Sequence, residues 1–240
     1  MKGVFVTFEG GEGTGKSTQV KLLAEHLKKI GRNVLTTREP GGTKEGETIR
    51  QLLVSGDTEK LSPEAEMLLN FASRDVHLHQ VIRPALAKGM IVLCDRFVDS
   101  TMVYQCYAGG ASVDLALYLK DAIVGDTTPD LTFVLDVAPE IGVTRSKVRM
   151  AQYESSAGHL MDRAMKQNSS KLFGAALDVE TLSHEDRYER MGWRYHQKVR
   201  DGFLQVAKED PDRCVVIDAS TGIEAVHIAI LAEIESLGAR

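Results

Sequence analysis

The feature that most constrains this chain is a glycine-rich segment, Gly10–Ser17, which reads GGEGTGKS and follows the apolar run Val4–Phe8. It fits the pattern G-x-x-x-x-G-K-[ST], whose glycines let the backbone wrap around phosphate oxygens and aim its N–H groups at them. After Ser17, apolar residues fall at helical spacing as far as Leu27, and Gly31 supplies a stop. The order of strand, loop and helix predicts a phosphate-binding loop, in which the helix dipole also favours an anion.

The side chains of this loop predict a triphosphate site with a metal ion. Lys16 can reach the β- and γ-phosphates, and the hydroxyl of Ser17 can ligate Mg²⁺. The alternative is a glycine-rich turn that binds nothing, and the flanking strand and helix argue against it. We expect the phosphates of a nucleotide to contact the following residues: Gly10, Gly11, Gly13, Thr14, Gly15, Lys16, Ser17 and Thr18.

Four more short apolar runs alternate with helical patterns along the chain, and they are Asn33–Thr37, Met90–Cys94, Leu131–Val137 and Cys214–Ile217. This alternation predicts an α/β fold, with a five-stranded parallel sheet flanked by helices. Polar residues end most of these runs, among them Glu9, Arg38, Asp95 and Asp218. Because ligands of open parallel sheets bind beyond the carboxyl ends of the strands, we expect these residues to converge on one cleft.

Asp95-Arg96-Phe97 ends the third run, which the expected topology places beside the phosphate loop. An aspartate there can hold Mg²⁺ through water, and the adjoining arginine can neutralise a phosphoryl group in transfer. At the end of the second run, Arg38 next to a Pro-Gly-Gly turn suits anion binding. The alternative for Arg38 is an ordinary ion pair with a nearby carboxylate.

Helical periodicity predicts helices at Glu45–Val54, Pro63–Ala87, Ser100–Tyr107, Val113–Val124, Glu185–Ala207 and Ile223–Leu237. The segment Met150–Ser183 lacks a sustained apolar face, and we interpret it as an insertion with mobile or weak helical structure. Its alternative is a solvated extension without a chemical role. We expect Trp193 and Tyr195 to pack in the core or at a hinge rather than to stack on a base.

The totals describe a single domain, residues 1–240, with 43% hydrophobic and 26% charged residues. The net charge of -5 excludes a chain-wide basic field, so we expect neither nucleic acid nor an anionic membrane as a partner. Cys94, Cys106 and Cys214 lack metal-ligand spacing, which favours reduced, buried thiols. With no leader segment and no run of membrane-spanning length, we expect a cytoplasmic protein.

Four segments together resemble the thymidylate kinase family, and they are Glu9–Thr18, Thr37–Gly42, Asp95–Gln105 and Asp186–Glu189. The resemblance extends from Val4 to Leu237, apart from the insertion at about 150–183. The Arg-Glu-Pro-Gly-Gly and Asp-Arg-Phe-x-x-Ser segments are far more specific than the phosphate loop alone.

The resemblance implies a P-loop nucleoside monophosphate kinase fold with a mobile lid at about residues 142–190. It implies transfer of the γ-phosphoryl group of ATP to the 5′-phosphate of dTMP, giving dTDP and ADP, with Mg²⁺ as cofactor and a homodimer as the assembly. One alternative is a kinase for another nucleoside monophosphate or a deoxynucleoside. Another is a nucleotide-dependent switch, but the sequence has no guanine-reading Asn-Lys-x-Asp segment.

The resemblance implies that four residues contact the 5′-phosphate and the sugar of the acceptor. Arg38 matches the arginine that binds the 5′-phosphate, and Arg96 matches the arginine between donor and acceptor phosphates. Glu12 looks like the carboxylate that receives the 3′-hydroxyl. Tyr104 matches the ring that packs on the sugar and disfavours a 2′-hydroxyl. These four complete the phosphate and sugar half of the implied dTMP site.

The base half of the implied site contains Arg74, which matches a base-recognising arginine, with Thr101 and Gln105 at thymine-bonding positions. Relatives place a phenylalanine four residues before that arginine, whereas this chain has Asn70 there and Phe71 next to it. One residue on a helix is about 100° of rotation, so Phe71 cannot take the place of that ring without a local shift. We include Asn70 and Phe71 in the implied dTMP site.

In relatives whose phosphate loop lacks an arginine, as here with Gly13, the lid supplies the catalytic arginines. The resemblance favours Arg149 and Arg187 for the phosphates and Arg145 for packing on adenine, beside a loop at Asp218-Ala219-Ser220. Each is an ordinary exposed helix arginine in the alternative interpretation. The implied catalytic set is Lys16, Arg96, Arg149 and Arg187, and the implied metal-binding pair is Ser17 and Asp95.

Overall fold

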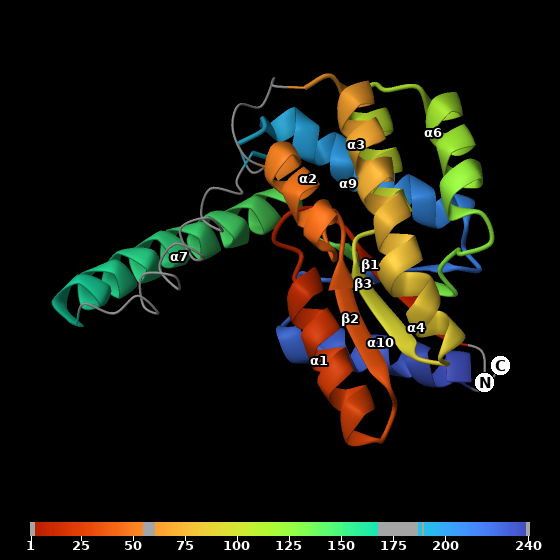
Figure 1. Ribbon diagram of the computed structural model, residues 1–240, viewed down its shortest axis with the longest axis horizontal. Helices are drawn as coiled ribbons and strands as arrows, with labels where there is room; N and C mark the ends of the chain where they lie inside the picture. Colours follow the sequence, from red (N-terminus) through yellow and green to blue (C-terminus); the bar gives the residue numbers. More distant parts are fainter. Residues whose placement is uncertain (1–2, 55–60, 168–186, 189, 239–240) are drawn as a thin grey trace.

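The computed structural model describes residues 3–54, 61–167, 187–188 and 190–238 (Figure 1). These residues contain a five-stranded sheet of order β2-β3-β1-β4-β5, in which all neighbouring strands pair in parallel. The predicted α/β fold with a five-stranded parallel sheet is confirmed. The strands are β1 (Val4–Glu9), β2 (Val34–Arg38), β3 (Ile91–Asp95), β4 (Leu131–Asp136) and β5 (Cys214–Asp218).

Helices cover both faces of the sheet (Figure 1). Alternate residues of β1 point to opposite faces: Val6 and Phe8 pack toward α1 and α10, whereas Phe5 packs toward α3. Helix α9 packs on β4 and β5, on the same face of the sheet as α3. The segments are α1 (Lys16–Lys29), α2 (Lys44–Val54), α3 (Pro63–His77), η1 (Leu78–Ile82), α4 (Arg83–Ala87), α5 (Val98–Thr101), η2 (Met102–Ala108), α6 (Val113–Leu119), η3 (Lys120–Val124), α7 (Pro139–Gln167), α9 (Trp193–Glu209) and α10 (Ile223–Gly238).

The predicted helix over Pro63–Ala87 is continuous, because the π-helical segment η1 joins α3 to α4. Ser62 begins it as an N-cap whose side chain accepts a hydrogen bond from the backbone N–H of Ala65 at 3.2 Å. Another π-helical segment, η2, continues α5 across the carboxyl end of β3. These two helical runs form the walls of the cleft described below.

The helix predicted over Glu185–Ala207 begins later than expected. Helix α9 starts at Trp193, after Gly192 in an extended conformation, and Tyr188 lies in a turn before it. Trp193 is 49% exposed, so the prediction that it packs in the core is wrong, and its alternative position at a hinge stays a prediction. Tyr195 is partly buried against the core that contains α9. The apolar pattern places the helix start too early, because it includes Tyr188, which packs against Tyr104 from this turn rather than from a helix.

Helix α7 is long and extends away from the sheet (Figure 1). Residues 150–167, the first half of the predicted insertion, continue α7 as regular helix, so weak structure is not found there. The rest of that predicted insertion, residues 168–183, lies outside the described residues. Within the described ranges, no helix is both long and apolar enough to cross a membrane.

The phosphate loop occupies the turn between β1 and α1 at the carboxyl edge of the sheet. Gly13 has a φ of 65°, and a Cβ added there would lie 1.9 Å from the carbonyl oxygen of Gly142 in α7. Only glycine fits this close backbone approach without displacement. The loop is therefore packed directly against the first turns of α7.

Candidate active site

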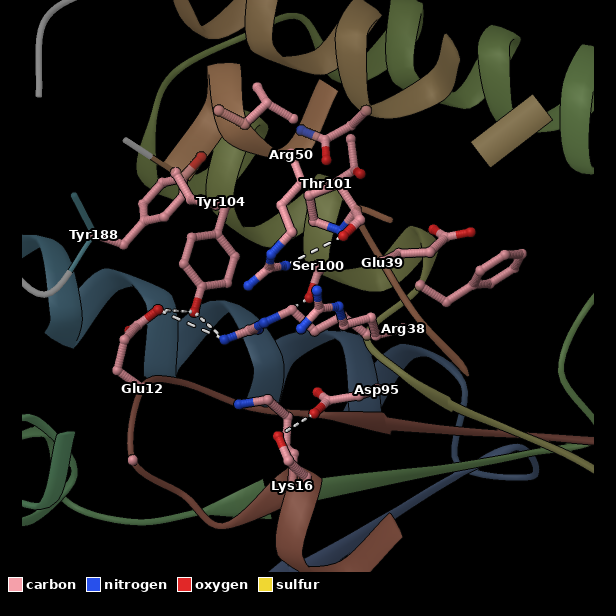
Figure 2. A pocket seen from close by; sticks show the side chains of 18 of the residues that line it. Glu12, Lys16, Arg38, Glu39, Arg50, Asp95, Ser100, Thr101, Tyr104 and Tyr188 are labelled. Carbon is pink, nitrogen blue, oxygen red and sulfur yellow. Dashed lines mark hydrogen bonds and ion pairs between the residues drawn. The ribbon is translucent and has the colours of Figure 1, made fainter. Parts of the chain in front are cut away.

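A cavity of about 370 Å³ opens beyond the ends of β2 and β3, where Arg38 and Asp95 line it (Figure 2). Glu9 and Asp218, which the sequence also predicts at this cleft, are not among its lining residues. The phosphate loop forms its floor, α2, α3 and η2 form its walls, and α7 contributes Arg149. Lys16, Ser17 and Asp95 line the cavity. All residues predicted to bind dTMP, except Phe71, line it too, and they are Glu12, Arg38, Asn70, Arg74, Arg96, Thr101, Tyr104 and Gln105.

Lys16 lies buried at the floor of the cavity with its ammonium group turned onto its own loop. The Nζ atom donates to the carbonyl oxygens of Gly10 at 3.0 Å and Gly11 at 2.7 Å, and to Oγ1 of Thr14 at 3.3 Å. Burial and the charge of Arg96 lower the pKa of Lys16 to about 8, against the opposing effect of nearby carboxylates. A bound polyphosphate would restore the charge that burial disfavours.

Ser17 and Asp95 are hydrogen-bonded, with the Ser17 hydroxyl donating to the Asp95 carboxylate at 2.5 Å. A hydroxyl and a carboxylate are oxygen ligands of the kind Mg²⁺ prefers, and Mg²⁺ takes its other ligands from water and substrate phosphates. The described part of the chain contains no cluster of three or more His, Cys, Asp or Glu side chains that could hold a metal ion. The Ser17 and Asp95 oxygens therefore fit Mg²⁺ that arrives with a nucleotide.

Arg96 is held in a left-handed backbone conformation, with a φ of 68°. Its Nη1 donates to the carbonyl oxygen of Gly10 at 2.9 Å and to Oγ of Ser100 at 3.1 Å, and its Nη2 donates to the Tyr104 hydroxyl at 3.0 Å. Glu9 supports this loop by accepting from the Ser100 hydroxyl at 2.6 Å. Burial raises the pKa of Glu9.

Glu12 and Tyr104 form the wall of the cavity beside Arg96 (Figure 2). The Tyr104 hydroxyl donates to the Glu12 carboxylate at 2.6 Å, Arg96 lies 3.6 Å from it, and His196 lies 3.4 Å from its other oxygen. Burial raises the pKa of Glu12, but the hydrogen bond with His196 and the charge of Arg96 outweigh it and hold the pKa at about 2. Glu12 therefore presents a fixed negative charge.

Arg38 reaches the cavity from the end of β2 and pairs with Glu47 of α2 at 2.9 Å. Arg50, one helical turn further along α2, also lines the cavity and donates to the carbonyl oxygen of Pro40 at 3.2 Å (Figure 2). Sequence patterns did not single out Arg50, since an arginine on an amphipathic helix is ordinarily exposed. The acceptor end thus has one more arginine than predicted.

Arg74 is 2% exposed at the opposite end of the cavity. Its Nε donates to Glu39 at 2.8 Å, and its Nη2 donates to Thr101 at 3.1 Å. Its Nη1 is buried without a hydrogen-bond partner among the described residues. Since an unpaired buried donor is costly, the arrangement suits a ligand that supplies an acceptor here.

Phe71 does not line the cavity, and this corrects its predicted contact with the base. It is 1% exposed within the core formed by α3, η2 and β3, and its ring lies 4.9 Å from the guanidinium carbon of Arg74. The 100° rotation between neighbouring helix residues turns Phe71 inward and Asn70 toward the cavity. Asn70 donates to the carbonyl oxygen of Glu66 at 2.9 Å.

The three arginines predicted from the lid occupy different places. Arg149 lines the cavity, and Arg145 donates to the carbonyl oxygen of Ala219 at 2.9 Å, beside the loop after β5. Arg187 is instead buried, where it forms an ion pair with Glu66 and donates to the carbonyl oxygen of Leu53 at 2.8 Å. Its predicted contact with the phosphates is not found in this conformation, because Glu66 neutralises its charge away from the loop.

Comparisons with known proteins agree with this geometry. The family model described as thymidylate kinase matches residues 8–178. A thymidylate kinase of Caulobacter vibrioides is 42% identical over 229 residues, which cover 95% of this chain and 94% of the relative. One from Magnetococcus marinus is 41% identical over 235 residues, with coverage of 98% and 97%.

A solved structure is also similar along nearly the whole chain. The crystal structure of thymidylate kinase from Ehrlichia chaffeensis matches with a TM-score of 0.69 and 33% sequence identity, covering 98% of this chain and 99% of that one. The phosphate loop, the two strand-end arginines and these matches lead to the same conclusion. The chain belongs to the thymidylate kinase family.

Proposed function

We propose that the cavity is the two-substrate site at which this thymidylate kinase transfers the γ-phosphoryl group of ATP to the 5′-phosphate of dTMP, giving dTDP and ADP. The observation that carries the proposal is the convergence of three cations, Lys16, Arg38 and Arg96, on one cavity whose far end holds Arg74. A kinase for a phosphate-bearing acceptor needs cations between two anions and a base site one nucleotide away.

The donor site extends from the phosphate loop to the loop after β5. The backbone N–H groups of the loop and the N-terminus of α1 suit the phosphates of ATP, and Lys16 leaves the loop carbonyls when a phosphate replaces them. Arg145, which donates to the carbonyl oxygen of Ala219 at 2.9 Å, is our candidate for packing on adenine. Arg149 reaches the cavity from α7 and is our candidate for the lid arginine that contacts the phosphates.

The acceptor site follows the opposite wall. We assign the 5′-phosphate of dTMP to Arg38 and Arg96, and the sugar to Glu12 and Tyr104, with the Tyr104 ring packing on the sugar and disfavouring a 2′-hydroxyl. The base is assigned to Arg74, whose unpaired Nη1 suits the 4-oxo group of thymine, with contributions from the following side chains: Asn70, Thr101 and Gln105.

Ser17 and Asp95 would hold Mg²⁺ with the nucleotide, Ser17 directly and Asp95 through water. When bound, the ion supplies charge neutralisation between the transferring phosphates. Asp95 accepts a hydrogen bond from the Ser17 hydroxyl, and this bond keeps the carboxylate oxygen of Asp95 oriented toward the phosphate loop.

The transfer proceeds in line and needs no covalent intermediate, since phosphoryl transfer is catalysed mainly by positioning and electrostatic stabilisation. Lys16 and Arg96 neutralise the transferring group, and Arg38 holds the acceptor phosphate in line with it. A phosphate monoester is already anionic, so a general base matters less than these cations. Closure of residues 142–150 of α7 over the cavity would exclude water, which competes as an acceptor.

Radiolabel transfer from γ-labelled ATP tests this assignment. We expect label in dTDP with dTMP as acceptor and none in dTMP when thymidine is the acceptor, because Arg38 and Arg96 require a phosphate to hold. An Arg38→Met variant should raise the KM for dTMP strongly while the KM for ATP changes little. Efficient phosphorylation of thymidine would favour the deoxynucleoside kinase alternative.

We also propose a homodimer that buries apolar side chains of α3 and α6. Leu68 of α3 and Leu117 and Tyr118 of α6 are exposed, and Tyr118 is 70% exposed. Large exposed apolar groups on adjacent helices are typical of an association surface. Sedimentation velocity should find a dimer for the native chain and a monomer for Tyr118→Glu, and a monomeric native chain at micromolar concentration would contradict this proposal.

A further inference from the structure

Glu66 is a buried carboxylate on α3 at the base end of the cavity, and sequence patterns did not single it out. It forms an ion pair with Arg187, and its other oxygen, Oε2, accepts from the Tyr188 hydroxyl at 3.1 Å and from Nε2 of Gln105 at 3.1 Å. Nε2 of Gln105 also lies 3.3 Å from the Tyr188 hydroxyl. Glu66 thus joins the segment before α9 to a side chain that lines the base site.

The charge of Glu66 decides how the Gln105 amide is oriented. A carboxylate in an ion pair accepts hydrogen bonds and donates none, and Glu66 forms such a pair with Arg187. Gln105 must therefore turn its NH₂ group toward Glu66. Both hydrogen bonds that the Gln105 side chain makes with described residues use its NH₂ group, and Gln105 lines the cavity, so we infer that its carbonyl oxygen is available to a ligand there.

The base site consequently offers one donor and one acceptor with fixed positions. The donor is Nη1 of Arg74, and the acceptor is Oε1 of Gln105. A 4-oxopyrimidine such as thymine presents the complementary pattern, an acceptor at O4 and a donor at N3–H. A 4-aminopyrimidine such as cytosine presents the reverse pattern and would leave buried donors facing donors.

We propose that Glu66 is a positioning residue that selects a 4-oxopyrimidine over a 4-aminopyrimidine by fixing the orientation of the Gln105 amide. This inference rests on the proposed function, since it concerns the base of the acceptor nucleotide. Glu66 acts through Gln105 and does not itself touch the substrate.

Glu66→Gln is a nearly isosteric change with a definite structural consequence. Arg187 can only donate, so it captures the new amide oxygen and turns the new NH₂ group toward Gln105. Gln105 then reverses and presents its own NH₂ group to the base. This NH₂ group can donate to N3 of cytosine but faces the N3–H donor of thymine. Arg74 still presents a donor to the 4-amino group of cytosine. The selectivity for thymine over cytosine is therefore reduced rather than inverted.

The test compares kcat/KM for dTMP, dUMP and 5-methyl-dCMP in the native chain and in Glu66→Gln. The first and third acceptors share the methyl group and differ only in hydrogen-bonding pattern. We expect the ratio of dTMP to 5-methyl-dCMP to fall at least about tenfold in the variant, since misdirected polar groups in such sites cost large factors. The ratio of dTMP to dUMP, which reports the methyl group, should stay within about threefold.

Tyr188→Phe is the matched control, because it removes the hydroxyl that contacts both Glu66 and Gln105 but leaves the carboxylate of Glu66 facing the Gln105 amide. Its ratio of dTMP to 5-methyl-dCMP should stay within about threefold of the native value. A purely structural role of Glu66 would lower turnover of all three acceptors in parallel. An unchanged ratio in Glu66→Gln, or an equal fall in Tyr188→Phe, would overturn the proposal.

If Glu66→Gln does not fold, Gln105→Met provides the second variant, because it removes the group that Glu66 orients. Loss of selectivity against 5-methyl-dCMP supports the proposal, and retained selectivity overturns it. Failure of the native chain to phosphorylate dTMP would instead refute the proposed function. The two outcomes are therefore distinguishable.

Discussion

Replacing Glu12 by glutamine tests the electrostatics of the phosphate loop quantitatively. The pKa of Glu12 is lowered from an ordinary value of 4.5 to about 2 in the folded chain. Since one pKa unit is worth about 1.4 kcal/mol, ionised Glu12 contributes about 3 kcal/mol to the free energy of unfolding. Glu12→Gln has nearly the same shape and removes this charge, so we expect that loss at neutral pH.

The sign of the pH dependence follows from the depressed pKa. The contribution of ionised Glu12 to the free energy of unfolding is complete above its unfolded-state pKa of 4.5, and it is lost as the pH falls toward the folded-state pKa of about 2. Urea denaturation of both proteins should therefore give a difference of about 3 kcal/mol at pH 7 and about 2 kcal/mol at pH 3.5. Taking the difference between the two proteins cancels the titration of all other groups.

Glu47→Gln is the control for a carboxylate that pairs with an arginine at the surface. Burial raises the pKa of Glu47, but its hydrogen bonds with Arg38 and Gly42 and the nearby arginine charges together outweigh burial and lower the pKa, and the pair with Arg38 is about two-fifths exposed. Solvent screening should limit its cost to less than about 1 kcal/mol. A cost for Glu12→Gln below about 1 kcal/mol at pH 7, or one that does not shrink in acid, would refute the reasoning.

Three further predictions concern the loop, the central arginine and the core below the base. Gly13→Ala should abolish tight ATP binding in calorimetry, because its Cβ would lie 1.9 Å from the Gly142 carbonyl oxygen at a positive φ; native affinity would contradict this. Arg96→Ala should lower kcat by about two to four decades, and a drop below tenfold would remove Arg96 from the catalytic set. Phe71→Ala should cost about 3–5 kcal/mol in urea denaturation, because its buried ring supports Arg74. A cost under about 1 kcal/mol would show that the ring is not core.

Much of the fold is predictable from local patterns. The apolar runs coincide with the five strands to within a residue or two, because buried parallel strands need short apolar segments bounded by breakers. The strand-end rule then places Arg38 and Arg96 in one cavity with Lys16. Asn70 faces the cavity as predicted, but the prediction that Phe71 contacts the base is wrong, because the rotation between neighbouring helix residues turns Phe71 into the core.

The parts that escaped prediction depend on contacts between distant residues. Arg187 and Glu66 are 121 positions apart, and no local pattern indicates that they pair. Glu66 also accepts from the hydroxyl of Tyr188, in the turn that precedes the start of α9 at Trp193. A buried carboxylate such as Glu66 has no spacing signature, since its partners come from separate elements.

The most direct test of the account is a competition among acceptors in one reaction. ATP and Mg²⁺ are mixed with equal concentrations of dTMP, dUMP, thymidine, CMP and GMP, and mass spectrometry follows the initial rates of product formation. We predict that dTDP forms fastest, because Arg38 and Arg96 require a 5′-phosphate and the base site at Arg74 fits thymine. Faster formation of any other product would contradict it.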